Sequence, residues 1–372
     1  MKKKYICATT VSVSIADLFG RVIDEMSKTH EVVAISAPGE GLDSLKGKES
    51  VRTIAVPMER RISIFKDLRS LWQMWNVMRR ERPDMVHSMT PKAGLICMLA
   101  SFLTRVPVRI HTFTGLVWPT STGLKRRILM FTDWLICSCA THIIPEGEGV
   151  KSDLLGHKIT KKPLKVLGYG NVKGIDLDYF NPEGKGYQKS HDGFTFVFVG
   201  RVVRDKGINE LISAFDRIRQ EHPDTKLWLV GRYENELDPL LPETSRRIEQ
   251  GDGIEMLGMQ SDVRPFYAQA DALVFPSYRE GFPNVVIEAG AMGLPSIVTD
   301  INGSREIIID GENGVIIPPQ DEEALYNAMK NFIEHPEVIT PMAANARQLI
   351  ASRFEKGFVR DCILAFYREV SQ

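Results

Sequence analysis

Two short segments in the second half of the chain carry residues whose types and spacing point to chemistry. The first is Gly200-Arg201, followed after a polar turn by Lys206-Gly207. It comes directly after an apolar, β-branched run, so both cations are expected at the carboxyl end of a strand. Open α/β sheets bind ligands at that edge, and the next helix points its first amide N–H groups there. Such a pair of cations suits a diphosphate; solvated surface charges are the alternative interpretation.

The second segment places two carboxylates, Glu280 and Glu288, around a Gly-Phe-Pro turn. A helix expected to begin near Asn284 puts both carboxylates near one helix N-terminus. Carboxylates accept hydrogen bonds from sugar hydroxyls, and the first amides of the helix, near Asn284 and Val285, bind phosphate oxygens. Acidic residues that only balance the helix dipole would explain one of the carboxylates, but not the pair with its glycines.

Other common catalytic patterns are missing from the sequence. The eight histidines never fall at H-E-x-x-H or H-x-H spacing, and no G-x-S-x-G, Walker A or G-x-G-x-x-G pattern occurs. Hydrolase, kinase and dinucleotide-binding functions therefore lose support. Asp176 and Asp178 match the D-x-D pair with which one class of nucleotide-sugar enzymes holds a divalent metal. Because such pairs are common by chance, we favour a structural role for them and expect no metal.

The elements that must position these segments alternate between strands and crossover helices. In the first half, strands are expected at residues 5–10, 31–36, 52–57, 85–88, 109–113 and 142–144. In the second half, strands are expected at residues 194–199, 226–230, 254–257, 272–275 and 296–298. Helices of that half are expected at residues 208–221, 263–269, 284–291 and 322–332. The sequence thus predicts an α/β fold.

A Pro- and Gly-rich stretch at residues 181–186 has the composition of a linker. We place the domain boundary there. Residues 1–182 then form an N-terminal α/β domain, and residues 183–372 form a similar C-terminal one. The last helix, about residues 356–372, could pack back on the first domain.

Length and composition fit a folded protein of two domains, with 372 residues, 43% of them hydrophobic and 25% charged. Lys plus Arg and Asp plus Glu both total 47, but residues 1–180 hold 27 basic and 17 acidic side chains. The basic first half predicts contact with something anionic, either a phosphate-rich ligand or a membrane surface. Scattered solvated charge is the alternative.

Cysteine usage and hydropathy indicate the compartment. The five cysteines are odd in number and lie in apolar runs, which is typical of reduced thiols in the cytosol. The longest uncharged apolar run, residues 93–104, is shorter than the about 20 residues that span a bilayer. We therefore expect a cytoplasmic protein whose membrane contact is at most peripheral.

One amphipathic helix is expected between the third and fourth strands. Its apolar positions are spaced by three and four residues: Ile64, Leu68, Leu71, Trp75 and Met78. We interpret this stripe as core. A membrane-interface role for Trp72 and Trp75 is the alternative.

A second segment combines cations with apolar side chains. Lys125-Arg126-Arg127 precedes the apolar residues 128–131, and Trp118 and Trp134 lie nearby. Such a segment could hold the protein on anionic lipid. A core helix with a solvated basic start, at residues 128–136, is the competing interpretation.

These motifs together resemble family 4 of the retaining, nucleotide-sugar-dependent glycosyltransferases, which have the GT-B fold. The resemblance rests on Glu280-x7-Glu288 and on Gly200-Arg201-x4-Lys206-Gly207, and it covers essentially the whole chain. Residues 174–180, which include Asp176 and Asp178, are similar to the run before the family's interdomain linker. Residues 83–88 and 90–94 are similar to members that build capsular and O-antigen polysaccharides.

The resemblance implies two Rossmann-type domains facing across a cleft, with the donor nucleotide held mainly by the second and the acceptor by the first. Arg201 and Lys206 match the cations on the donor diphosphate. Glu288 matches the carboxylate on the ribose, and Glu280 the one near the transferred sugar. The remaining implied donor contacts are the strand-end residue Gly200, the helix-start residues Pro283, Asn284 and Val285, and the first-domain histidine His111.

The chain departs from the family pattern after the first strand. A glycine-rich loop is usual there, whereas this chain has Thr10-Val11-Ser12-Val13-Ser14. Hydroxyl groups could replace backbone amides at this loop.

The resemblance thus implies a retaining transfer of a hexose or N-acetylhexosamine from a UDP-sugar to a glycan acceptor. Within that class, GDP-mannose is the alternative donor. The acceptor is expected to be lipid-linked or soluble, with an anionic membrane surface as a further partner and no nucleic acid. No metal or other cofactor is expected. The alternatives are an enzyme similar to UDP-N-acetylglucosamine 2-epimerase and a non-catalytic nucleotide-sugar-binding partner of a polysaccharide complex.

Overall fold

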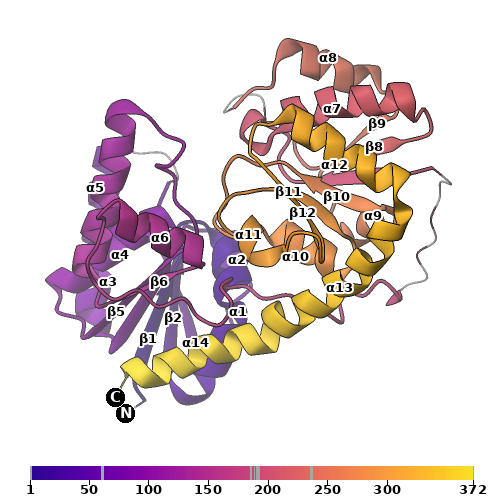
Figure 1. Ribbon diagram of the computed structural model, residues 1–372. Coiled ribbons are helices and arrows are strands. Elements are labelled where there is room, and N and C mark those ends of the chain that lie inside the picture. Colours follow the sequence, from indigo (N-terminus) through magenta and orange to yellow (C-terminus); the bar gives the residue numbers. More distant parts are fainter. Residues whose placement is uncertain are drawn as a thin grey trace. The chain divides into compact units, whose positions relative to one another are not determined.

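The computed structural model describes residues 2–59, 63–184, 187, 189, 193–234 and 238–371 (Figure 1). The chain divides into two compact units. The first holds Met1–Gly174 and Gly357–Gln372, and the second holds Ile175–Lys356. The predicted linker therefore falls inside the second unit, and its Lys185 and Gly186 lie outside the described residues.

The first unit is built on a parallel sheet of six strands in the order β3-β2-β1-β4-β5-β6. Its strands are β1 (Lys4–Ala8), β2 (Glu31–Ser36), β3 (Val51–Ala55), β4 (Met85–Met89), β5 (Val108–Phe113) and β6 (His142–Pro145). Most of their residues are buried, as expected for a sheet covered on both faces by helices.

Alternate residues of β1 face two separate cores. Tyr5 and Cys7 pack with α1 (Ser12–Thr29) and α14 (Lys356–Val370), whereas Ile6 and Ala8 pack with the opposite helical layer. That opposite layer is made by α3 (Ile64–Glu81), α4 (Pro91–Leu103) and α5 (Gly123–Cys139) (Figure 1). The unit also holds α2 (Glu40–Asp43) and α6 (Glu148–Gly156).

The second unit repeats this plan, with the strand order β12-β11-β10-β7-β8-β9 and all pairs parallel. Its strands are β7 (Thr195–Val199), β8 (Lys226–Val230), β9 (Ile254–Gly258), β10 (Ala272–Phe275), β11 (Ser296–Thr299) and β12 (Gly314–Ile317). Its helices are the short 3-10 turn η2 (Arg204–Lys206), α7 (Ile208–Glu221), α8 (Pro242–Gln250), α9 (Arg264–Gln269), α10 (Asn284–Ala291), α11 (Ser304–Ile307), α12 (Glu322–Glu334) and α13 (Pro336–Phe354).

Apolar periodicity explains why these segments form the elements they do. In α7, Ile208, Leu211, Ile212, Phe215 and Ile218 recur every three or four residues, and all are buried in the core of the second unit. The strand β7 is buried along its whole length. The two sheets confirm the predicted α/β class with two Rossmann-type domains.

The predicted core stripe of α3 is only partly core. Met78 is buried, and Leu71 and Trp75 pack partly against the core, but Ile64 and Leu68 are exposed. Periodicity correctly predicted a helix with an apolar stripe, but the part of that stripe on the first turns of the helix faces outward. Within the described ranges, no helix has both the length and the apolar character needed to cross a bilayer.

Candidate active site

The strand order of the second unit brings two loops together. β7 and β10 are neighbours, but the chain leaves β7 toward β8 on its other side, so a topological switch point lies between β7 and β10. Ligands of open α/β sheets bind outside the carboxyl ends of the strands at such a point. Arg201 and Lys206 follow β7, and Glu280 follows β10.

A glycine allows the two loops to approach closely. Gly207 has a φ of +71°, and a Cβ atom there would lie 2.1 Å from the carbonyl oxygen of Pro276. Hydrogen bonds to Asp205 hold the loops together. Its carbonyl accepts from the Tyr278 amide at 2.9 Å, and its carboxylate accepts from Arg279 at 3.0 Å. The loops after β7 and β10 therefore form one structure.

Lys206 and Glu280 form an ion pair across these loops. Both side chains are largely buried, and Ser277 Oγ also donates to Glu280 Oε1 at 2.9 Å. Lys206 Nζ lies 5.3 Å from the centre of the Phe275 ring. The structure thus holds an ammonium and a carboxylate in fixed positions at the carboxyl edge of the sheet.

Arg201 lies next to this pair in the chain and is more exposed. Its Nη1 donates to Glu234 Oε2 at 3.2 Å, and almost half of its side chain is open to solvent. Because exposed ion pairs of this kind contribute little to stability, Arg201 can exchange its partner for a ligand oxygen at small cost.

Helix α10 begins where the sequence predicts, with Pro283 as its N-cap and Asn284 as its first residue. Glu288 lies about one turn into the helix, where the hydroxyl of Tyr267 donates to its Oε2 at 3.3 Å. The same hydroxyl lies 3.4 Å from the carbonyl oxygen of Val285. Burial raises the pKa of Tyr267 well above its usual value, so it remains a hydrogen-bond donor. The first amides of α10 offer N–H groups to an anion.

His111 lies in the first unit, on β5, and is buried. It is paired in register with Ser88 on β4, whose Oγ lies 2.9 Å from His111 Nδ1. Burial lowers the pKa of His111 to about 3, so the ring is neutral near pH 7. The ring fits because residue 94 is glycine: a Cβ there would lie 2.3 Å from His111 Cε1.

The loop after β1 uses a hydroxyl group, but for an internal contact. Thr10 Oγ1 lies 2.7 Å from Thr90 Oγ1 and accepts a hydrogen bond from the Ala93 amide at 3.2 Å. These contacts join the loop to the first turn of α4. The structure therefore gives the Thr10 hydroxyl a structural partner at the place where the family's usual loop has glycine.

The D-x-D pair has a local structural role. The carboxylate of Asp176 forms an ion pair with Lys356, and it also accepts from the amides of Asp178 and Tyr179, both at 3.2 Å. These contacts shape the point where the chain enters the second unit.

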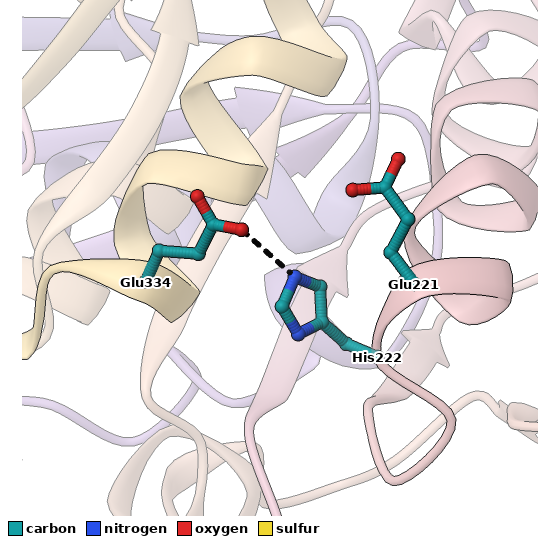
Figure 2. A group of neighbouring side chains, drawn as sticks. All are labelled: Glu221, His222 and Glu334. Atoms are coloured by element: carbon teal, nitrogen blue, oxygen red, sulfur yellow. Dashed lines mark ion pairs between the residues drawn. The ribbon is translucent and has the colours of Figure 1, made fainter.

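A different acidic group has atoms close enough to share a cation. It consists of Glu221 and His222 at the end of α7 and Glu334 at the end of α12 (Figure 2). Lys330 Nζ already lies 2.5 Å from Glu221 Oε2 and 3.8 Å from Glu334 Oε1. Because α7 runs from the carboxyl edge of the sheet back to the opposite edge, this group lies away from Lys206 and Glu280.

Several residues that shape the site were not predicted from the sequence. Ser277 and Asp205 fix the loops after β7 and β10, Tyr267 holds Glu288, and Ser88 contacts His111. Asp205, Tyr267 and Ser88 act across different elements of the fold, whereas Ser277 contacts Glu280 within one loop. Strand register would have revealed Ser88, but register is not visible in a single sequence.

The chain matches two family models. Residues 193–335 match "Glycosyl transferases group 1", and residues 19–170 match "Glycosyl transferase 4-like domain". Two curated relatives cover most of the chain. "Capsular polysaccharide biosynthesis glycosyltransferase CapM" of Staphylococcus aureus is 32% identical over 371 residues, covering 98% of this chain and 97% of the relative. "UDP-Gal:alpha-D-GlcNAc-diphosphoundecaprenol alpha-1,3-galactosyltransferase" of Escherichia coli is 27% identical over 319 residues, covering 82% of this chain and 81% of the relative.

A solved structure has the same fold. Anabaena Alr3699/HepE in complex with UDP-glucose superposes with a TM-score of 0.80 at 17% identity, covering 98% of this chain and 99% of that one. Two parallel six-stranded α/β units of this kind define the GT-B fold. With the family-model matches and the whole-length similarity to CapM, the chain belongs to the group 1 glycosyl transferases. The family expected from the sequence motifs is confirmed.

Proposed function

We propose that this glycosyl transferase moves a hexose or N-acetylhexosamine from a UDP-sugar to a glycan acceptor in polysaccharide biosynthesis, with retention of anomeric configuration. The observation that carries the proposal is the Lys206–Glu280 ion pair at the switch point of the second unit. It fixes a cation for phosphate and a carboxylate for a sugar hydroxyl next to each other, in a chain of this family.

Each residue at this edge has a role in the proposed donor site. Arg201 and Lys206 bind the diphosphate, together with the first amides of α10 at Asn284 and Val285. Glu288, held by Tyr267, accepts from the ribose hydroxyls, and Glu280 accepts from a hydroxyl of the transferred sugar. Gly200 and Pro283 line the donor beside them. In the first unit, the neutral His111 ring offers its Nε2 to the sugar.

The proposed reaction breaks the bond between the anomeric carbon and the diphosphate oxygen, and forms a bond from that carbon to the acceptor oxygen. Negative charge develops on the leaving diphosphate, so the preorganised Arg201, Lys206 and helix amides stabilise the transition state more than the ground state. The leaving phosphate oxygen takes the proton of the acceptor hydroxyl. No protein side chain acts as a covalent nucleophile in this scheme.

The relatives support UDP as the donor nucleotide and a lipid-linked acceptor. The Escherichia coli relative is named for UDP-Gal and a diphosphoundecaprenol acceptor, and the Anabaena structure contains UDP-glucose. The Staphylococcus aureus relative is named for capsular polysaccharide biosynthesis. GDP-mannose stays the alternative donor, and a soluble glycan stays the alternative acceptor. We place the activity in the cytoplasm, at the face of the membrane where a lipid-linked acceptor would be met.

We further propose that transfer needs no metal ion. Arg201 and Lys206 supply positive charge where other nucleotide-sugar enzymes use a metal. The Asp176 carboxylate, the first half of the D-x-D match, is already bound by Lys356 and two backbone amides.

A thermal-shift screen of nucleotides tests the donor proposal. A ligand at 100 times its dissociation constant adds about 2.7 kcal/mol to stability. We expect UDP and one or more UDP-sugars to raise the melting temperature, with a smaller effect of GDP at equal concentration. No shift with any nucleotide would count against the donor site, and a shift with GDP alone would replace UDP by GDP.

A further inference from the structure

The outward face of α3 is apolar for more than two turns. Ile64, Phe65, Leu68 and Trp72 all lie on one arc of the helix, and all are exposed, Phe65 by 88% and Trp72 by 63%. The buried side chains of the helix, including Met74 and Val77, lie on the opposite side. The packing of α3 on the sheet therefore leaves a second apolar face unused.

Helix α5 has the same two-sided character. Leu124, Ile128, Phe131 and Trp134 recur every three or four residues and are exposed, while Ile136 and Cys137 are buried. The rings of Phe131 and Trp134 stack with their centres 5.6 Å apart. The competing interpretation of residues 128–136 as a simple core helix is therefore wrong for its outer side.

One expected member of this surface is not part of it. Trp118 is fully buried, and its Nε1 donates to Asp133 Oδ2 at 3.0 Å. Of the two tryptophans predicted beside the basic segment, only Trp134 is exposed.

The two exposed stripes belong to one helical layer. α4 packs against both α3 and α5, and the three helices cover the same face of the first sheet (Figure 1). α4 adds exposed Phe102 and Leu103. Ten of the nineteen exposed large hydrophobic residues among the described ones lie on these three helices. A cluster of exposed apolar side chains on one helical layer indicates an interaction surface, whereas single exposed apolar residues are ordinary.

The charge of this layer has one sign. Every exposed charged residue of the three helices is a cation: Lys66, Arg69, Arg79, Arg80, Lys125 and Arg127. The three acidic residues of these helices are not exposed: Asp67 is half-buried and bound to Lys92, and Glu81 and Asp133 are buried. The three helices therefore present aromatic and aliphatic side chains among cations and carry no exposed anion. Lys66 is paired with exposed Glu59, which precedes α3, at 2.6 Å.

We propose that the outer face of α3, α4 and α5 docks on a bilayer that contains anionic lipid. Apolar side chains enter the boundary between headgroups and acyl chains, and the cations meet the lipid phosphates. A second copy of the chain fits less well, because a two-fold contact would set this cationic face against itself. The surface is independent of the transferase chemistry. Its use, keeping the enzyme beside a lipid-linked acceptor, rests on the proposed function.

Vesicle flotation tests the surface without donor or acceptor. We expect the protein to float with vesicles of phosphatidylcholine and phosphatidylglycerol, and less with phosphatidylcholine alone. Binding should weaken from about 50 to about 500 mM NaCl because salt screens the cations. It should also shift the fluorescence of exposed Trp72 and Trp134 to the blue, and Trp72→Phe should reduce that shift.

Matched variants locate the contact. Phe65→Ser with Trp72→Ser, and separately Lys125→Ala with Arg127→Ala, should each lower the apparent affinity for these vesicles at least about tenfold. The control is Leu241→Ser with Met259→Ser, which removes exposed apolar side chains from the second unit and should leave binding unchanged. The circular dichroism spectrum and the rate of transfer to a soluble acceptor should be the same for the wild type and all of these variants.

Two outcomes would overturn the proposal. One is a wild-type protein that stays unbound at low salt. The other is vesicle binding that survives both pairs of substitutions. If light scattering instead showed an oligomer that dissociates in the Phe65/Trp72 variant, the face would be an interface between copies. Loss of transfer with vesicle binding intact would count against the proposed function alone.

Discussion

Lys206 and Glu280 form an ion pair with each other. In the proposed complex, the diphosphate of the donor binds Lys206, and Glu280 accepts a hydrogen bond from a sugar hydroxyl. The two side chains therefore bind different parts of the donor. We expect Lys206→Ala, Glu280→Gln and Arg201→Ala each to lower turnover at least about tenfold, which is about 1.4 kcal/mol of barrier. Steady-state kinetics at saturating donor measures this.

The matched control for these variants is Arg204→Ala. Arg204 lies on the same short turn as Lys206, but its side chain is exposed and paired with Asp238. Its loss should change turnover by less than about twofold, since exposed pairs contribute little. Near-normal turnover in all three site variants would refute the assignment of the donor site.

Ser88 is expected to act through His111. The Ser88 hydroxyl lies at hydrogen-bond distance from Nδ1. When this hydroxyl donates to Nδ1, the ring proton is on Nε2, which can then donate to the sugar. Ser88→Ala should lower kcat about three- to tenfold, by loss of one hydrogen bond. The same substitution should have almost no effect in a His111→Ala background, because coupled residues are not additive. Equal effects in both backgrounds would show that Ser88 acts elsewhere.

At the scale of elements, the pairing of β4 with β5 buries two histidines. His87 and His111 are fully buried, and burial lowers the pKa of both below the usual value, His111 to about 3. Below about pH 6.5 the unfolded chain takes up protons that the folded chain does not, so the free energy of unfolding must fall as pH falls. Above that pH the two rings contribute no pH dependence.

Denaturant unfolding at pH 7 and pH 5.5 measures this loss. The decrease should be smaller in His111→Gln than in the wild type, and unchanged in His335→Gln, whose ring is exposed. The upper limit is about 1.4 kcal/mol per pH unit for each histidine. The same pH dependence in all three proteins would contradict the buried, neutral state of His111.

The close approach of the loops after β7 and β10 depends on Gly207. An alanine there would combine a positive φ with a clash against the Pro276 carbonyl. Gly207→Ala should therefore destabilise the protein by more than the about 1–2 kcal/mol of the backbone conformation alone, and raise KM for the donor. Gly311 has a similar φ of +79° with open space around it, so Gly311→Ala is the control. Equal destabilisation by both would mean that the loops can separate freely.

Local patterns predicted the elements around the site well. The bounds of β8, β10, α7 and α10 are those expected from the sequence, because each is a clear apolar run or stripe with a marked start and end. The motif with Lys206 follows a strand, as predicted, and Glu280 precedes the helix that was expected to begin near Asn284. Their direct ion pair was not predicted, because it depends on the neighbouring order of β7 and β10, which local periodicity does not encode.

Other features could not be read from the sequence for the same physical reason. The stripe of α3 showed that the helix has an apolar side, but not that Ile64 and Leu68 lie outside the core. The short β12 and the proline-containing α13 have weak local signals and are stabilised by their neighbours in the second unit. Burial is a property of the assembled unit, so periodicity alone overestimates the core.

At the scale of the whole molecule, the proposed function gives the two units different tasks. The second unit carries the paired cations and carboxylates, and the first carries His111 together with a cationic, apolar outer layer. This division matches the uneven charge of the two halves of the sequence. An enzyme that takes a water-soluble donor and a lipid-linked acceptor needs both kinds of surface.

The most direct test is transfer of labelled sugar from a UDP-sugar, measured with and without a diphosphoundecaprenol-linked acceptor, in the presence of EDTA. We expect UDP release and an acceptor product only when the acceptor is present, with the anomeric configuration of the donor kept and the rate unaffected by the chelator. Conversion of the donor without acceptor would indicate an epimerase-like enzyme. Donor binding without turnover, inversion at the anomeric carbon, or activity restored only by Mg²⁺ or Mn²⁺ would contradict the proposed mechanism.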